Sequence, residues 1–198
     1  MSIEWNDTLS AAAGIASAVA AFAALYAARQ SNATAATLAR IEHDRRHEER
    51  RPQLEVTLGG RGMQLSTLNV HLLGPDEIGH LDSITIRVDN DDQDHTILNP
   101  GAGLTQEEVD AHIWGPYRFT PGVDGADQYG RSIPSFPLTV GRGRSFQMER
   151  THPGHWMEGM DQNRWQEVYQ GTLVRLVISC RRGDDEWVLA RTAPNPAW

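Results

Sequence analysis

TLVRLVISCRRGDDEWVLART, residues Thr172–Thr192, contains two alternating apolar runs separated by a turn rich in Gly and Asp. In the first run Val174, Leu176, Ile178 and Cys180 occupy every second position, which places them on one face of a strand. The second run, WVLART, follows directly after the turn GDDE. Alternation on both sides of a short polar turn is typical of an antiparallel β-hairpin with one buried face.

The same alternation recurs along the chain after Pro52. Four further runs predict strands, because their apolar residues also fall on one face: Gln53–Leu58, Leu81–Asp89, Phe136–Val140 and Ser145–Arg150. Short alternating strands with Gly, Pro and Asp between them favour an antiparallel β-sandwich, and we expect it to be immunoglobulin-like. The topology stays open, because the Cys–Trp–Cys signature of true immunoglobulin domains is missing.

Two segments between the strands have helical patterns. Thr105–Ile113 begins with a residue that can cap a helix and carries Glu108 three positions later, which is the spacing of a capping box. Asp161–Gln170 also begins with a capping residue. We therefore expect a mainly β domain with two short helices at the ends of the sandwich.

The N-terminal part has a different character. Leu9–Ala28, LSAAAGIASAVAAFAALYAA, is 20 residues long and has no charge. This length suits a membrane-spanning helix, and Trp5 and Tyr26 stand where aromatic residues favour the two interfaces. Arg29 begins a basic flank, whereas the residues before the run carry only acidic charges. By the positive-inside rule, we expect an inner-membrane protein with its N-terminus outside and its C-terminal domain in the cytoplasm.

These patterns predict four parts: an N-terminal tail (1–8), a transmembrane helix (9–28), a helical stalk (29–51) and a β-sandwich domain (52–198). Ser10, Gly14 and Ala18 form a row of small residues that lets helices approach closely in lipid, so the helix face predicts a homo-oligomer as well as contact with the bilayer. The alternative is a soluble oligomer in which the alanine-rich helices form a shared core.

Charge and composition exclude several functions. The formal net charge is −8, and after Pro52 there are 20 acidic residues against 12 arginines, so we expect no nucleic-acid partner. All 18 basic residues are Arg, which excludes enzymes that depend on a Schiff-base lysine, a pyridoxal-phosphate anchor or a P-loop lysine. Cys180 is the one cysteine, so no intramolecular disulfide can form, and its place in the strand predicts a core residue.

The most distinctive loop is HIWGPYRFTPGVDGADQYGR, residues His112–Arg131. Aromatic residues among glycines, next to charged side chains, can form a surface that binds a protein partner. The alternative is that the rings close the open end of the sandwich. The candidate partner-binding residues are Trp114, Tyr117, Phe119, Asp124, Asp127, Tyr129 and Arg131.

Other polar clusters predict no catalytic, metal or cofactor site. Arg87–His95 contains four aspartates but lacks the glycine of a calcium-binding loop, so we expect a solvated strand end and turn. The pairs His43/His47 and His152/His155 lack further ligands at metal-binding spacing. No nucleophile elbow, zinc-protease motif or dinucleotide-binding motif occurs.

The runs HIWGPYRFTPGVDGADQYGR, HPGHW and ERRPQLEV, together with the N-terminal span, resemble actinobacterial membrane-anchored proteins that have a C-terminal β-sandwich domain. The resemblance implies this architecture and no catalytic residue. We expect a single-pass membrane-anchored module that binds or scaffolds a protein partner. A soluble structural oligomer and an enzyme of unrecognised type remain as alternatives.

Overall fold

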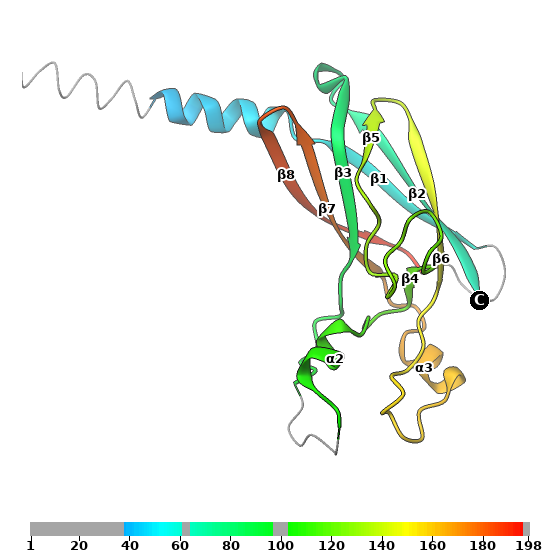
Figure 1. Ribbon diagram of the computed structural model, residues 1–198. Helices are drawn as coiled ribbons and strands as arrows, with labels where there is room; N and C mark the ends of the chain where they lie inside the picture. The colour runs from blue at the N-terminus through cyan, green and yellow to red at the C-terminus, as the bar shows by residue number, and fades with distance from the viewer. Residues whose placement is uncertain (1–37, 61–63, 97–102, 196–198) are drawn as a thin grey trace, which may run out of the picture. The chain divides into compact units, whose positions relative to one another are not determined.

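The computed structural model of the protein describes residues 38–60, 64–96 and 103–195. The chain divides into two compact units, residues 1–49 and 50–198. Within the described part of the second unit, strands form two four-stranded antiparallel sheets (Figure 1).

In the first unit, residues 38–49 are helical and lie within the predicted stalk. Ion pairs at i,i+4 spacing join Arg45 to Glu49 and Arg46 to Glu42, each at 3.0 Å, as in a helix surrounded by water. Among the described residues, no helix is long and apolar enough to cross a membrane. The predicted span, Leu9–Ala28, lies outside the described residues.

Each sheet is held together by antiparallel ladders. The first sheet has the order β1 (Gln53–Gly60), β2 (Leu65–Gly74), β6 (Gly143–Arg150) and β4 (Tyr117–Phe119). The second sheet has the order β5 (Phe136–Thr139), β3 (His80–Val88), β7 (Val174–Arg182) and β8 (Asp185–Ala193). A 3₁₀ turn, η1 (Asp76–Ile78), lies between β2 and β3.

The predicted hairpin is confirmed as β7 and β8. Their register runs without a break from Val174↔Ala193 to Arg182↔Asp185. The turn has only two residues, and Gly183 has φ 55, a value at which a side chain would cost energy. Because the turn is this tight, β8 begins at Asp185, two residues before the predicted start.

One hydrophobic core fills the space between the two sheets, which confirms the two-layer β fold. Val174, Leu176, Ile178 and Cys180 are all buried, as the alternation predicted. They join a cluster that also contains Leu68, Val70, Phe146 and Met148 from the first sheet and Ile84 and Ile86 from the second. Burial raises the pKa of the Cys180 thiol to about 12, which suits a core residue.

Two strands were not predicted from the sequence. The core-facing residues of β2 do alternate, as Leu68, Val70 and Leu72, but Leu65 and Leu73 occupy the opposite phase and are exposed. The apolar pattern is therefore diluted at both ends. β4 has only three residues, too few to give a periodic signal.

The two predicted helices are present and shorter than expected. They are α2 (Gln106–Ala111) and α3 (Gln162–Val168), and both lie at the same end of the sheets (Figure 1). The predicted capping box at the start of α2 is confirmed, since Thr105 and Glu108 bond to each other's backbone. Asp161 caps α3 by accepting a hydrogen bond from the Arg164 backbone.

The fold predicts a large effect at the centre of β7. Ile178 is fully buried, so Ile178→Ala should lower the free energy of unfolding by about 2–5 kcal/mol through lost burial and a cavity. Val188→Ala on the neighbouring strand should change it by less than about 0.5 kcal/mol, because Val188 is exposed. Denaturant unfolding measures both, and similar losses would contradict the observed register.

Candidate binding pocket

A second, smaller hydrophobic cluster lies beside α2 and α3, separate from the sandwich core. It consists of Val109 from α2, Trp165 from α3, and the buried rings of Trp114 and Tyr169. Leu104, Trp156, Met157 and Met160 pack around it. Each helix has fewer than two full turns, so packing in this cluster, rather than helix propensity, stabilises the pair.

Asn90, just beyond β3, connects the sandwich to α2. Its Oδ1 atom accepts hydrogen bonds from the backbone N–H of Trp114 and from Arg131 Nη1, each at 3.2 Å. Arg131 in turn donates through Nη2 to the carbonyl oxygens at the end of α2, with the shortest distance 2.7 Å to His112. The guanidinium thereby satisfies helix-end carbonyls that the helix itself leaves without partners.

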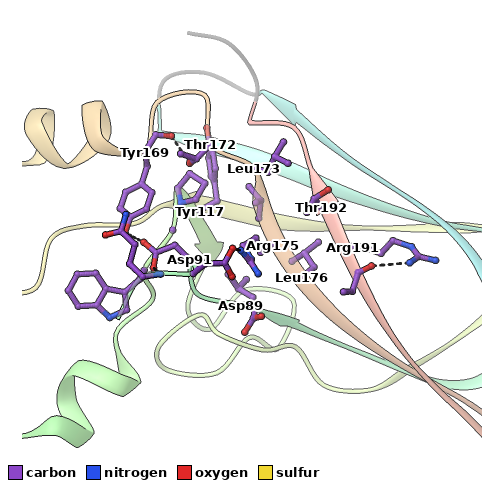
Figure 2. A pocket seen from close by; sticks show the side chains of 18 of the residues that line it. Asp89, Asp91, Tyr117, Tyr169, Thr172, Leu173, Arg175, Leu176, Arg191 and Thr192 are labelled. Atoms are coloured by element: carbon purple, nitrogen blue, oxygen red, sulfur yellow. Dashed lines mark hydrogen bonds and ion pairs between the residues drawn. The ribbon is translucent and has the colours of Figure 1, made fainter. Parts of the chain in front are cut away.

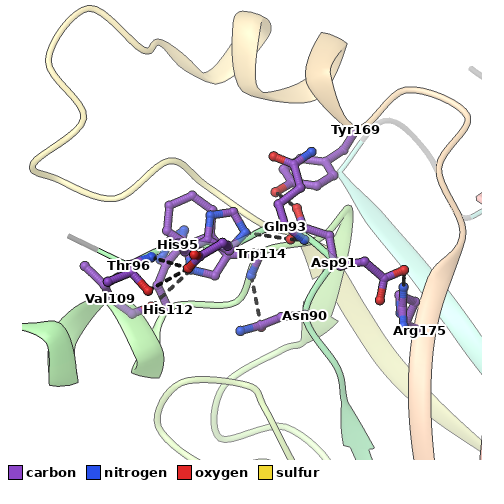
Figure 3. Close-up of polar contacts among 12 residues, drawn as sticks. Asn90, Asp91, Gln93, His95, Thr96, Val109, His112, Trp114, Tyr169 and Arg175 are labelled. Atoms are coloured by element: carbon purple, nitrogen blue, oxygen red, sulfur yellow. Dashed lines mark hydrogen bonds and ion pairs between the residues drawn. The ribbon is translucent and has the colours of Figure 1, made fainter. Parts of the chain in front are cut away.

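Asp91 makes the corresponding connection to α3 (Figure 3). Its Oδ2 atom accepts a hydrogen bond from the Tyr169 hydroxyl at 2.9 Å. Its Oδ1 atom is 2.6 Å from His95 Nε2, and because a carboxylate can only accept, this nitrogen carries the proton. The backbone N–H of Asp91 donates to the Trp114 carbonyl at 2.8 Å. We call Asn90 and Asp91 together the β3 joint.

The surroundings of the joint strengthen these contacts. The His95 ring stacks on Trp114, with ring centroids 3.7 Å apart and planes 7° from parallel. Burial and the hydrogen bond to Asp91 raise the pKa of Tyr169, so the phenol stays protonated and keeps donating. Hydrogen bonds to a charged acceptor in a partly dry environment are stronger than neutral ones.

A cavity of about 780 Å³ opens between the joint, the residues after α3, and the ends of β7 and β8 (Figure 2). The apolar part of its lining includes Tyr117, Leu176, Val168 and Leu173. The last two are 53% and 49% exposed, although large apolar side chains are usually covered. The volume lies in the range of about 300–1,000 Å³ that is usual for ligand sites.

The polar lining carries charges of both signs: Asp89, Asp91 and Asp92, and also Arg175 and Arg191. Arg175 forms an ion pair with Asp92, and this hydrogen bond lowers the pKa of Asp92 and raises that of Arg175. The Asp92 side chain is 81% exposed, so the pair contributes little to folding and can exchange its partner readily.

The predicted partner-binding loop is mostly interior. Trp114, Tyr117 and Phe119 are 8%, 2% and 1% exposed, so their rings are not available to a partner on an open surface. For these three the alternative holds: they close the sandwich end, and Trp114 and Tyr117 also line the pocket. Tyr129 is 52% exposed and is the one ring of the four that a partner could contact.

The charged candidates in this loop hold the backbone in place. Asp127 accepts hydrogen bonds from the backbone N–H groups of Tyr129, Arg131 and Ser132, and from the Ser132 hydroxyl. Asp124 accepts from the Gln147 backbone at 2.8 Å. Arg131 is half-buried against α2, and burial lowers its pKa. These contacts give the three residues a structural role.

The residues that position the pocket were missed by the sequence analysis. Asn90, Asp91 and His95 belong to the run that was predicted to be a solvated turn, and this prediction is wrong for them because they are hydrogen-bonded and largely covered. Their partners are 24 and 78 residues away for Trp114 and Tyr169. The sequence signal was a dense polar run beside a strand end, which a solvated turn also produces.

His112 is enclosed by rings of Trp114, Trp156 and Trp165, with centroids 4.9–5.5 Å away. Burial, with the nearby charges of Arg118 and Arg131, lowers its pKa to about 4. The imidazole is therefore neutral near neutral pH, which suits its packing among aromatic rings.

In the described parts of the chain, no group of three or more His, Cys, Asp or Glu side chains is placed to hold a metal ion. No family model, curated protein or solved structure matches the chain.

The Asp91–Tyr169 hydrogen bond predicts a measurable loss of stability. Tyr169→Phe keeps the ring in its cluster but removes the donor to a charged acceptor, which should cost about 1.5–3 kcal/mol in denaturant unfolding. Tyr129→Phe is the matched control and should cost less than about 0.5 kcal/mol, because that hydroxyl belongs to an exposed residue. Equal small losses would mean that the joint does not hold α3.

His112 predicts a pH dependence. Its folded pKa of about 4 lies below the ordinary value of 6.5, so the unfolded chain binds the proton more readily. This contribution is fully present above about pH 6.5 and is lost as the pH falls towards 4. With allowance for solvent screening, the loss between about pH 7 and pH 5 should be about 1–2 kcal/mol.

The measurement is the difference in unfolding free energy between these two pH values for the protein, for His112→Gln and for His155→Gln. The first variant should lose the dependence, and the second should keep it, because His155 is exposed. An unchanged dependence in His112→Gln would assign it to other groups.

Proposed function

We propose that this protein is a membrane-anchored binding module that recognises a partner protein through the pocket beside Asp91. The observation that carries the proposal is the pocket itself: about 780 Å³, lined by apolar side chains and by three aspartates and two arginines. Pockets with mostly apolar linings and a few placed polar groups are the usual binding sites of proteins.

The rim of the pocket supports a protein partner. Val168 and Leu173 are both about half exposed and stand at the same opening. Exposed apolar side chains that lie together and are rimmed by polar residues mark sites of protein contact. Asp89 and Asp92, together with the net charge of −8, favour a partner segment that is positively charged.

The strand orders support an immunoglobulin-like arrangement of the domain. The order β1-β2-β6-β4 fits the A-B-E-D sheet of a constant-type immunoglobulin domain, and β3-β7-β8 fits its C-F-G sheet. β5 is an addition next to β3, at the edge opposite β8. In this arrangement the pocket lies at one end of the sandwich, where loops and strand ends are free to vary.

The anchor part of the proposal rests on the sequence. The uncharged run Leu9–Ala28 has the length of a span, and Arg29 and the arginines of the stalk follow it. We propose that this helix crosses the inner membrane with the N-terminus outside, so that the β-sandwich faces the cytoplasm. The small-residue row at Ser10, Gly14 and Ala18 would allow two such helices to pack together.

A series of small probes tests the pocket. Benzylammonium, benzyl alcohol and benzoate share one ring and differ in charge. Each probe is titrated into the full chain in detergent micelles, and the backbone amide NMR signals of residues around Leu173 and Arg175 are followed. Benzylammonium should shift these signals most, benzyl alcohol less and benzoate least, because aspartates line the pocket.

Leu173→Arg and Leu73→Arg form the matched pair for this titration, since both leucines are about half exposed but only Leu173 lines the pocket. The first adds a positive charge that repels benzylammonium and should remove its shifts, and the second should keep them. Benzylammonium shifts that survive Leu173→Arg would contradict the pocket as the binding site.

The anchor predicts that the full chain sediments with membranes and stays there after carbonate extraction. A reporter fused after Trp198 should show cytoplasmic activity. Recovery of the full chain in the soluble fraction without detergent would favour the soluble oligomer instead, and reporter activity on the outer side would reverse the orientation.

A further inference from the structure

The four edge strands of the two sheets differ in how well they could accept another strand. β4 has three residues, and β5 has four and contains Pro137. β1 follows Pro52 and its register shifts between Gln53 and Leu54. Short length, proline and bulges are the usual features that prevent an edge from pairing. β8 has none of them: its nine residues pair with β7 in one unbroken register and contain no proline.

The ladder shows which backbone groups of β8 face outwards. The backbone N–H of Asp89 donates to the Arg175 carbonyl at 2.9 Å, so Arg175 faces β3 rather than β8. Backbone groups alternate in direction along a strand, so the neighbouring β7 residue Leu176 faces β8 and bonds to its partner Arg191. The groups of Val188, Ala190 and Thr192 therefore face the outer edge of the sheet, where none of the described strands forms a ladder with β8.

A side chain confirms this direction at one position. The Ala190 carbonyl accepts a hydrogen bond from Arg191 Nη1 at 2.9 Å. The long Arg191 side chain thus occupies the Ala190 carbonyl, an acceptor that an added strand would otherwise use. Since an arginine side chain can move away at little cost, the contact does not prevent pairing.

The pocket extends along this edge. Ala190, Arg191 and Thr192 belong to β8 and also line the cavity beside Asp91 (Figure 2). Residues alternate between the two faces of a strand, so a segment added next to β8 would direct every second side chain towards one face. One of these side chains would enter the pocket, where apolar side chains and aspartates line the cavity.

We propose that β8 accepts an extended segment of a partner protein as an added strand, and that an Arg or Lys of this segment fills the pocket. The aliphatic stem would lie on Leu173 and Val168, and the charged head would reach Asp89 and Asp92. This inference rests on the proposed function, since it uses the same pocket. Strand addition supplies affinity through backbone hydrogen bonds, and the pocket supplies specificity.

The test begins with a display library of random peptides of about eight residues, the length of a strand, selected on the full chain in detergent micelles. The selected peptides should be rich in β-branched residues and should share one Arg or Lys at the same position. Affinities of the synthesised peptides are then measured for the full chain and for three variants: Val188→Pro, Val188→Thr and Leu173→Arg.

Val188→Pro removes one backbone N–H on the outer side of β8 and leaves the hydrogen bonds between β8 and β7 in place. Val188→Thr keeps this N–H and has a side chain of similar shape. Binding should weaken about two- to tenfold in Val188→Pro, the effect of one lost backbone hydrogen bond, and stay unchanged in Val188→Thr. A peptide methylated on alternate backbone nitrogens should lose affinity in the same way, which tests the edge without altering the protein.

The outcomes are distinct. Equal affinity for Val188→Pro and Val188→Thr overturns strand addition, and the proposed function stands if Leu173→Arg still weakens binding. No selected peptide, or no effect of Leu173→Arg, overturns both. If the selected peptides lack Arg and Lys, the proposal that a cationic side chain fills the pocket is overturned. A full-chain dimer that Val188→Pro dissociates would show that a second copy occupies β8, which also overturns the partner peptide.

Discussion

Asn90 and Asp91, the two residues that form the β3 joint, connect the β-sandwich to α2 and α3. The sandwich has its own core, but the second cluster is too small to stand alone and gains little from helices of six and seven residues. The joint supplies what burial does not. Its side chains bond Trp114, Arg131 and His95 on the α2 side and Tyr169 on the α3 side. Buried polar groups of this kind are costly when unpaired and strong when satisfied, so they fix one arrangement.

The pocket follows from this arrangement. Tyr169, held by Asp91, places the residues after α3 opposite the ends of β7 and β8, and the cavity is the space left between them. The same segment brings Val168 and Leu173 to the rim. Asp89 and Asp92, which line the pocket, flank the two joint residues just beyond β3. The residues that hold the two helices and part of the pocket lining thus lie in one stretch of chain.

The strands could be predicted where alternation was clear, and the helices where caps were clear. Ile178 and its neighbours on β7 fall on the predicted face, and Thr105 with Glu108 forms the predicted capping box. The site could not be predicted, because local pattern does not separate a solvated polar turn from a buried one. Asp91 and Tyr169 are 78 positions apart in the sequence and meet only in the fold, and three of the four rings in the aromatic loop turn inward because they have a core to fill.

The most direct measurement is amide hydrogen exchange in the full chain and in Asp91→Ala, with Asp94→Ala as the control, since Asp94 bonds only to Thr96 nearby among the hydrogen bonds of the described chain. We expect Asp91→Ala to speed amide exchange in Gln162–Val168 and in the residues up to Leu173 by at least about tenfold, while β3 and β7 keep their protection. Unchanged exchange in α3, or an equal increase throughout the sandwich, would contradict the claim that the β3 joint holds the pocket in place.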